Sequence, residues 1–150
     1  MKILRSTIRN ILIKEARCAE ATEKIQSGID FLYANKMHLE YYRGSFGDLE
    51  IRLYKEHEPA YEEDGYYYEA EYRQFGMLDA YKQAEEPCYV LSYAGVHPDL
   101  YGTGLGALLY EVAIELVTKM GSYLACDRET VSSKARKMWR YFASSDIFTQ

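Results

Sequence analysis

The residues with the clearest chemical potential form a glycine-rich loop between an apolar segment and an amphipathic one. Its residues are Tyr101, Gly102, Thr103, Gly104, Leu105, Gly106 and Ala107. Glycine lacks a Cβ atom, so backbone N–H groups can approach an anion closely at the positive end of a helix dipole. The spacing is neither that of a Walker A loop nor the GxGxxG of a dinucleotide fingerprint. The loop therefore indicates phosphate binding, with an ordinary flexible turn as the alternative.

The segment around this loop resembles the acetyl-CoA signature of the GNAT superfamily of N-acetyltransferases. That signature is a V-x-P strand end followed by R/Q-x-x-G-x-G/A at the start of a helix. Val96 and Pro98 match its first part, and Gly104 and Gly106 match its second. Tyr101 departs from the family's arginine or glutamine, which removes a side-chain contact to the pyrophosphate but leaves the backbone donors. The resemblance continues in Ser132, Ala135, Met138 and Trp139, which are similar to the family's N-x-x-A-x-x-L-Y. This serine-and-tryptophan version resembles bacteriophage-encoded members.

The resemblance implies that acetyl-CoA binds where two central strands splay apart, with its pantetheine arm paired to the backbone like an added strand. A primary amine of a small molecule or a protein then attacks the thioester directly in a ternary complex. A backbone N–H near Ala94 to Val96 would stabilise the oxyanion. The implied cofactor-binding residues are Ala94, Val96, Tyr101, Gly102, Thr103, Gly104, Leu105, Gly106, Ala107, Ser132, Ala135 and Trp139.

Proton transfer is the least defined part of this reading. The position of the glutamate that many relatives carry is occupied by Val90, and Ser92 is the nearest polar residue on that face. We therefore expect Ser92, or Glu71 acting through water, to serve in catalysis, although Ser92 also fits a simple packing role. Trp139 replaces the usual thiolate-protonating tyrosine. These gaps favour a second reading, a non-catalytic or weakly catalytic acetyl-CoA-binding protein that acts on a partner such as a host protein.

Charge and composition narrow the range of partners. The formal net charge is −5, which disfavours nucleic acid as the principal ligand. Acidic residues concentrate in one stretch and could attract a cationic amine or a basic protein segment, although a solvated acidic loop is the better explanation of them. These residues are Glu56, Glu58, Glu62, Glu63, Asp64, Glu69 and Glu71. Basic residues near the C-terminus are candidates for the 3′-phosphate of coenzyme A, namely Arg128, Lys134, Arg136, Lys137 and Arg140.

No pattern in the sequence indicates a metal site or a membrane-spanning segment. The histidines His38, His57 and His97 are scattered, so no metal is expected. The three cysteines lack the spacing of a zinc site or a disulfide framework, which indicates a reducing compartment. No apolar run is long enough to cross a bilayer, and a cytoplasmic location is expected.

The 150 residues suit one domain, residues 1–150. Hydrophobic spacing predicts a mainly helical first third, interrupted near Gly28 and again before Tyr41. It predicts strands over residues 49–54, 66–72, 88–96 and 122–127, with the third covered on both faces, and helices over 104–120 and around Trp139. The expected fold is α/β (α+β in some schemes), a GNAT-like mixed, mostly antiparallel sheet with flanking helices. The chain stops shortly after the last helix, where most relatives add two strands, so we expect a homodimer.

Overall fold

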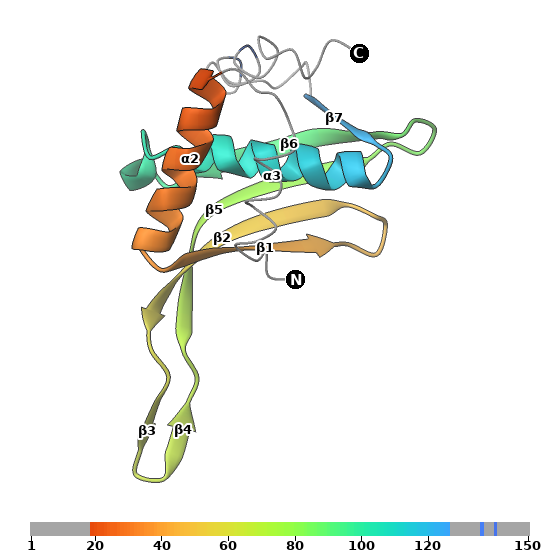
Figure 1. Ribbon diagram of the computed structural model, residues 1–150. Coiled ribbons are helices and arrows are strands. Elements are labelled where there is room, and N and C mark those ends of the chain that lie inside the picture. The colour runs from red at the N-terminus through yellow and green to blue at the C-terminus, as the bar shows by residue number, and fades with distance from the viewer. Residues whose placement is uncertain (1–18, 127–135, 137–139, 141–150) are drawn as a thin grey trace.

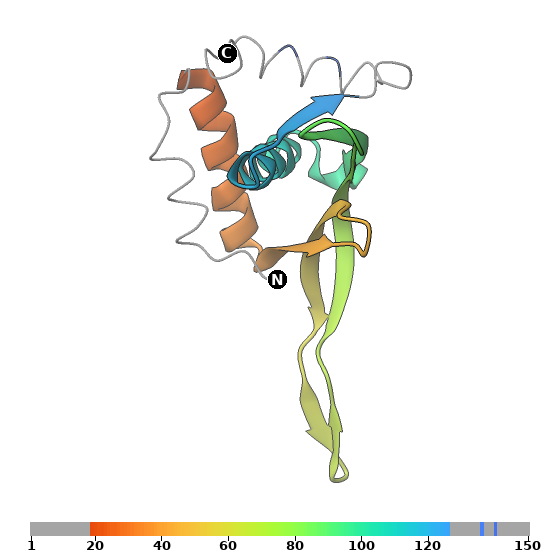
Figure 2. The same ribbon diagram turned by 90° about the vertical axis from the view of Figure 1, so that its right-hand side faces the viewer.

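The computed structural model describes residues 19–126, together with Arg136 and Arg140. A curved sheet carries two helices on one face, and a two-stranded ribbon projects from its end (Figures 1 and 2). The elements are α2 (Ala19–Ala34), β1 (Met37–Arg43), β2 (Leu49–Glu58), β3 (Tyr61–Glu63), β4 (Tyr66–Tyr68), β5 (Glu71–Lys82), β6 (Cys88–Val96), a 3-10 helix (Pro98–Leu100), α3 (Leu105–Lys119) and β7 (Tyr123–Cys126). The predicted mixed α+β class is confirmed.

The main sheet has five strands in the order β1-β2-β5-β6-β7. Neighbouring strands are antiparallel except for β6 and β7, which are parallel. A parallel pair needs a crossover connection, which α3 provides by running back along the sheet between β6 and β7. The sheet is therefore mostly antiparallel, as predicted, and its one described parallel pair involves the first half of β6, while the glycine loop follows the end of that strand.

Alternating side chains explain which face of the sheet is covered. Leu49, Ile51 and Leu53 of β2 are fully buried, as the sequence period of two predicts. Leu78 and Ala80 of β5 are buried on the same side. These residues pack with the apolar stripe of α3 and with Ile25, Ile29 and Leu32 of α2. Burying each large aliphatic side chain contributes roughly 1.5–3 kcal/mol, so this layer fixes the position of both helices on the sheet.

The predicted helical first third is wrong beyond Ala34. Helix α2 continues through Gly28 without interruption, and the next segment is strand β1 rather than helix. Met37 and Leu39 of β1 are buried at a period of two, and Tyr41 on the same face is partly buried against the core. Residues 1–18, where the helical pattern begins, lie outside the described part of the chain.

Two predicted strands also have different limits in the structure. The expected strand over residues 66–72 is two strands, because β4 ends at Tyr68 and β5 begins at Glu71. Strand β5 then runs to Lys82, through a stretch for which no element was predicted, and its polar residues face away from the core. Strand β6 was expected to be covered on both faces, but only Cys88 to Leu91 are buried. The expected helix over 104–120 is confirmed as α3.

Within the described residues, the structure has neither a membrane-spanning helix nor a candidate metal site. No helix within the described residues is long and apolar enough to cross a membrane. In the same part of the chain, no group of histidine, cysteine, aspartate and glutamate side chains is arranged to hold a metal ion. The expected final helix lies outside the described residues, apart from Arg136 and Arg140, which are helical and exposed.

Candidate functional site

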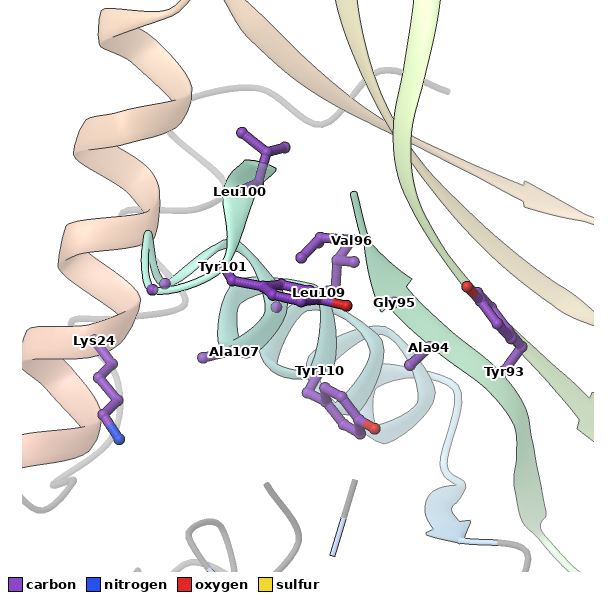
Figure 3. A pocket seen from close by; sticks show the side chains of 13 residues that line it. Lys24, Tyr93, Ala94, Gly95, Val96, Leu100, Tyr101, Ala107, Leu109 and Tyr110 are labelled. Carbon is purple, nitrogen blue, oxygen red and sulfur yellow. The ribbon is translucent and has the colours of Figure 1, made fainter. Parts of the chain in front are cut away.

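A cavity of about 600 Å³ opens between the outer half of β6, the glycine loop and the first turns of α3 (Figure 3). Most of its walls are apolar or backbone. Its lining residues are Lys24, Tyr93, Ala94, Gly95, Val96, Leu100, Tyr101, Gly102, Gly104, Gly106, Ala107, Leu109 and Tyr110. The pocket thus joins a strand edge to a helix N-terminus.

Strand β6 changes its surroundings at Ser92. Its parallel pairing with β7 runs from Cys88 to Leu91, which is opposite Cys126, the last residue of β7. At the next residue the antiparallel ladder with β5 shifts register, because Asp79 faces Tyr93 while Ala80 faces Leu91. Ser92 is therefore the extra residue of a β-bulge, a feature that bends a strand and increases its twist. Beyond the bulge, no described strand pairs with the β7 side of β6, so among residues 19–126 this backbone edge is unpaired beside the pocket.

The Ser92 side chain has a structural contact. Its hydroxyl donates a hydrogen bond to the backbone carbonyl oxygen of Asp79 at 3.0 Å. This bond ties the bulged residue back to β5, across the register shift. Ser92 does not line the pocket. The structure therefore gives this predicted catalytic residue a role in shaping the strand.

The loop that follows β6 is held by several hydrogen bonds. The backbone N–H of His97 donates to the carbonyl oxygen of Phe75 at 2.7 Å, which anchors the end of β6 to β5. The Thr103 hydroxyl donates to the carbonyl oxygen of Leu100 at 2.7 Å. From α2, the Ser27 hydroxyl donates to the carbonyl oxygen of Thr103 at 3.2 Å. The loop is thus fixed before any ligand arrives.

Two glycines from distant parts of the chain make the closest contact between α2 and this loop. Gly104 has a φ of 87°, a left-handed conformation that side chains rarely adopt. A Cβ on Gly104 would overlap the carbonyl oxygen of Lys24, and a Cβ on Gly28 would lie 2.5 Å from the carbonyl oxygen of Gly104. The sequence led us to expect an interruption of the helix near Gly28, but α2 is continuous there. Gly28 lets the helix backbone touch the loop.

The first turn of α3 offers unused hydrogen-bond donors. The N–H groups of Gly106 and Ala107 lie too early in the helix for an intrahelical acceptor, and they bond to no other described residue. The helix dipole adds partial positive charge at this end. Lys24 on α2 contributes an ammonium group to the same pocket, across the loop from β6 (Figure 3). Tyr101 lies over this turn toward Val96 (Figure 3). The arrangement suits an anionic group.

Sequence reasoning missed Lys24 and Asp79. Lys24 carries no local signal, because it lies far from the loop in the chain and reaches the pocket only through the packing of α2. Asp79 does have a signal: it alternates with buried Leu78 and Ala80 in a strand, where a carboxylate is unusual. In the structure it lies opposite Tyr93, which lines the pocket, and opposite Glu50 on β2.

The environment of Asp79 perturbs its carboxyl group. The Oδ1 atom is buried and accepts no hydrogen bond from a described residue. Burial raises the pKa of Asp79 above its ordinary value, and the negative charge of Glu50 raises it further. Arg52 opposes this effect only in part, because its guanidinium is paired with Glu50 at 2.8 Å. Asp79 is thus a carboxylate that binds a proton more readily than usual, next to a pocket residue.

The structure brings together most of the predicted cofactor-binding residues. Ala94, Val96, Tyr101, Gly102, Gly104, Gly106 and Ala107 line the pocket. Thr103 belongs to the same loop, but its hydroxyl is already engaged in the hydrogen bond to Leu100 within that loop. Leu105 is buried in the core. Glu71 is not brought to the pocket: it is exposed, opposite Glu58, and lies about 26 Å along β5 from Asp79 at the usual rise per residue. Ser132, Ala135 and Trp139 lie outside the described residues.

The pocket has the chemistry of a site for an elongated ligand with an anionic part. Helix donors and Lys24 suit the anion, the open edge of β6 suits an amide-bearing chain, and Val96, Leu100 and Leu109 supply apolar walls. Comparisons of the chain with known protein families, with curated proteins and with solved structures gave no match.

Proposed function

We propose that the chain is an acetyl-CoA-dependent N-acetyltransferase with the GNAT fold. The observation that carries this proposal is the meeting, in one pocket, of a glycine-lined helix N-terminus and the open edge of a bulged strand. The unpaired part of β6 begins directly after its parallel pairing with β7 ends, and this is where the family resemblance of the glycine loop leads us to expect the cosubstrate. A diphosphate and an amide-bearing arm are what these two features would recognise.

Acetyl-CoA would be bound in three parts. Its diphosphate would accept hydrogen bonds from the N–H groups at the start of α3, with Lys24 as counter-ion. Its pantetheine amides would pair with the free backbone edge of β6 near Ala94 and Val96, like an added strand. The thioester would then lie toward the bulge, within reach of backbone N–H donors that can stabilise an oxyanion.

The transfer itself needs a neutral amine and two proton movements. The amine nitrogen attacks the thioester carbonyl carbon, and the tetrahedral intermediate collapses as the C–S bond breaks. Asp79 would take the proton released by the amine through a bridging water, since it lies beside the pocket rather than in its wall. Its raised pKa suits this role, because a base works best when its pKa approaches the working pH. The departing thiolate takes up a proton from water, and protonated Asp79 returns its proton to water. An amide and free coenzyme A are the products.

One observation favours a second function, a non-catalytic acetyl-CoA-binding protein. Among the described residues that line the pocket there is no carboxylate and no histidine. Proton transfer would then depend on Asp79 or on the tyrosine hydroxyls of Tyr93, Tyr101 and Tyr110. A pocket that holds acetyl-CoA without such groups could serve as a structural or sensing site.

The decisive experiment is a calorimetric titration with acetyl-CoA, followed by measurement of free thiol release with panels of small amines and lysine peptides. Saturable one-to-one binding and amine-dependent thiol release are expected for the enzyme. Binding without thiol release would support the second function. If neither acetyl-CoA nor coenzyme A binds at micromolar to millimolar concentrations, the proposed cosubstrate is wrong.

Replacing Lys24 with methionine tests the anion part of the site. Methionine keeps much of the apolar stem but removes the charge, so the affinity for acetyl-CoA should fall about tenfold, the size of one charge-assisted contact. The salt dependence of the affinity should weaken as well. Lys36→Met, at an exposed lysine in the turn after α2 that does not line the pocket, is the control. Equal affinities for the Lys24 variant and the unaltered protein would remove Lys24 from the site.

A further inference from the structure

Away from the pocket, the most exposed part of the described chain is the arm, residues 56–72. It comprises β3, β4 and the adjoining ends of β2 and β5, and it projects from the sheet in both views (Figures 1 and 2). Its tyrosines are solvent-exposed, and Tyr66 and Tyr67 each keep 70% of their surface accessible. A two-stranded ribbon gains little stability from its own packing in water. Aromatic side chains in such a position favour a contact surface.

The charge of the arm indicates the charge of the partner that it can bind. The arm has seven carboxylates and neither lysine nor arginine, so its formal charge is −7, compared with −5 for the whole chain. None of these carboxylates forms an ion pair with a described residue. Glu58 even faces Glu71 across the strands, and like charges in that position destabilise a ribbon. A cationic partner would relieve this repulsion.

The register of the strands places aromatic rings beside the carboxylates. Three cross-strand pairs set a glutamate opposite a tyrosine: Glu56 and Tyr72, Glu62 and Tyr67, and Glu63 and Tyr66. In addition, Tyr61 and Tyr68 stack with ring centroids 4.6 Å apart. A guanidinium group can bind a carboxylate with two hydrogen bonds while it stacks on a neighbouring ring, which an ammonium group does less well. The arm therefore fits arginine better than lysine.

We propose that the arm is a docking surface for an arginine-rich segment of another protein. An extended segment could run along either edge of the β3-β4 ribbon, since neither edge is paired with a further described strand. Its arginines would lie between the tyrosines and glutamates. Nucleic acids and anionic membranes would be repelled by the charge, and the arm of a second copy would be repelled in the same way. This surface works independently of acetyl transfer in the pocket.

A direct binding experiment tests the partner chemistry. The full chain is titrated into a fluorescent peptide of alternating arginine and serine, and anisotropy is recorded at several salt concentrations. We expect saturable binding that weakens as salt rises. The corresponding lysine peptide should bind several-fold less tightly, and a glutamate peptide should not bind. Equal affinity for the arginine and lysine peptides would overturn the choice of arginine.

Two double variants distinguish a specific binding surface on the arm from general electrostatic attraction of the arginine peptide. Tyr66→Ser with Tyr67→Ser keeps every carboxylate, whereas Glu62→Gln with Glu63→Gln keeps every tyrosine. Each should weaken binding of the arginine peptide about tenfold without changing the thermal midpoint, because all four side chains are exposed. Tyr81→Ser, at an exposed tyrosine outside the arm, is the control. If the tyrosine variant binds as well as the unaltered protein, or if sedimentation reveals a dimer that is lost in these variants, the proposal is overturned.

Discussion

Replacing Gly104 with alanine is expected to lower the free energy of unfolding by about 2–5 kcal/mol and to abolish measurable binding of acetyl-CoA. The left-handed φ of 87° is unfavourable for alanine, and the new methyl group would overlap the backbone carbonyl of Lys24. Moving the backbone of α2 would cost a large amount of free energy, so the loop would instead move away from the helix. The N–H groups that line the pocket would move with it. Urea denaturation and calorimetric titration measure the two effects.

Two neighbouring glycines serve as controls for this experiment. Gly102 has a similar φ of 80°, but a Cβ there would meet nothing within 4 Å. Gly102→Ala should therefore cost only the conformational strain, about 1–2 kcal/mol. Gly106 has ordinary helical geometry and open space around its Cβ position, so Gly106→Ala should be neutral or slightly stabilising. Equal losses for Gly104→Ala and Gly102→Ala would mean that the contact with α2 does not constrain the loop.

Replacing Asp79 with asparagine is expected to reduce the turnover number at least about 100-fold while leaving the affinity for acetyl-CoA unchanged. The reason is that asparagine keeps the shape of the side chain but cannot accept the proton released by the amine. The same change should make the protein more stable at neutral pH. Burial and Glu50 raise the pKa of Asp79 in the folded state, so keeping this group ionised opposes folding at any pH above that pKa. Turnover from thiol release and urea denaturation at pH 7 give the two values.

The pH profile provides a further check on Asp79. A general base acts only when ionised, so turnover should fall as the pH drops through the pKa of Asp79, which burial and Glu50 raise from its ordinary value. Glu50→Gln removes a neighbouring negative charge, lowers the pKa of Asp79 and should shift this fall to lower pH. Ser92→Ala, which removes only the hydrogen bond to the backbone, should leave the profile in place. If Asp79→Asn retains full turnover, another group accepts the proton.

Local sequence patterns determined much of the fold because the forces behind them act between neighbours in the chain. The period-two run at Leu49, Ile51 and Leu53 specifies a strand with one buried face, and the stripe along α3 specifies an amphipathic helix. The glycine loop between β6 and α3 could also be recognised from the chain alone. Its conformation depends on a short stretch of backbone and on the helix that follows it. Strand β1 escaped notice because only Met37 and Leu39 are buried in it.

The tertiary structure alone decided which distant residues complete the site. Lys24 and Gly28 reach the loop because α2 packs across α3, and no pattern within α2 reveals that approach. The pairing of β5 with β6 places Asp79 opposite the pocket residue Tyr93, and the pKa of Asp79 is raised by burial and by Glu50 from another strand. Glu71 was a catalytic candidate in the sequence, but the direction of β5 carries it into the arm. Residue type and spacing specify backbone conformation locally, whereas proximity across elements and the resulting burial and charge arise only from the packed fold.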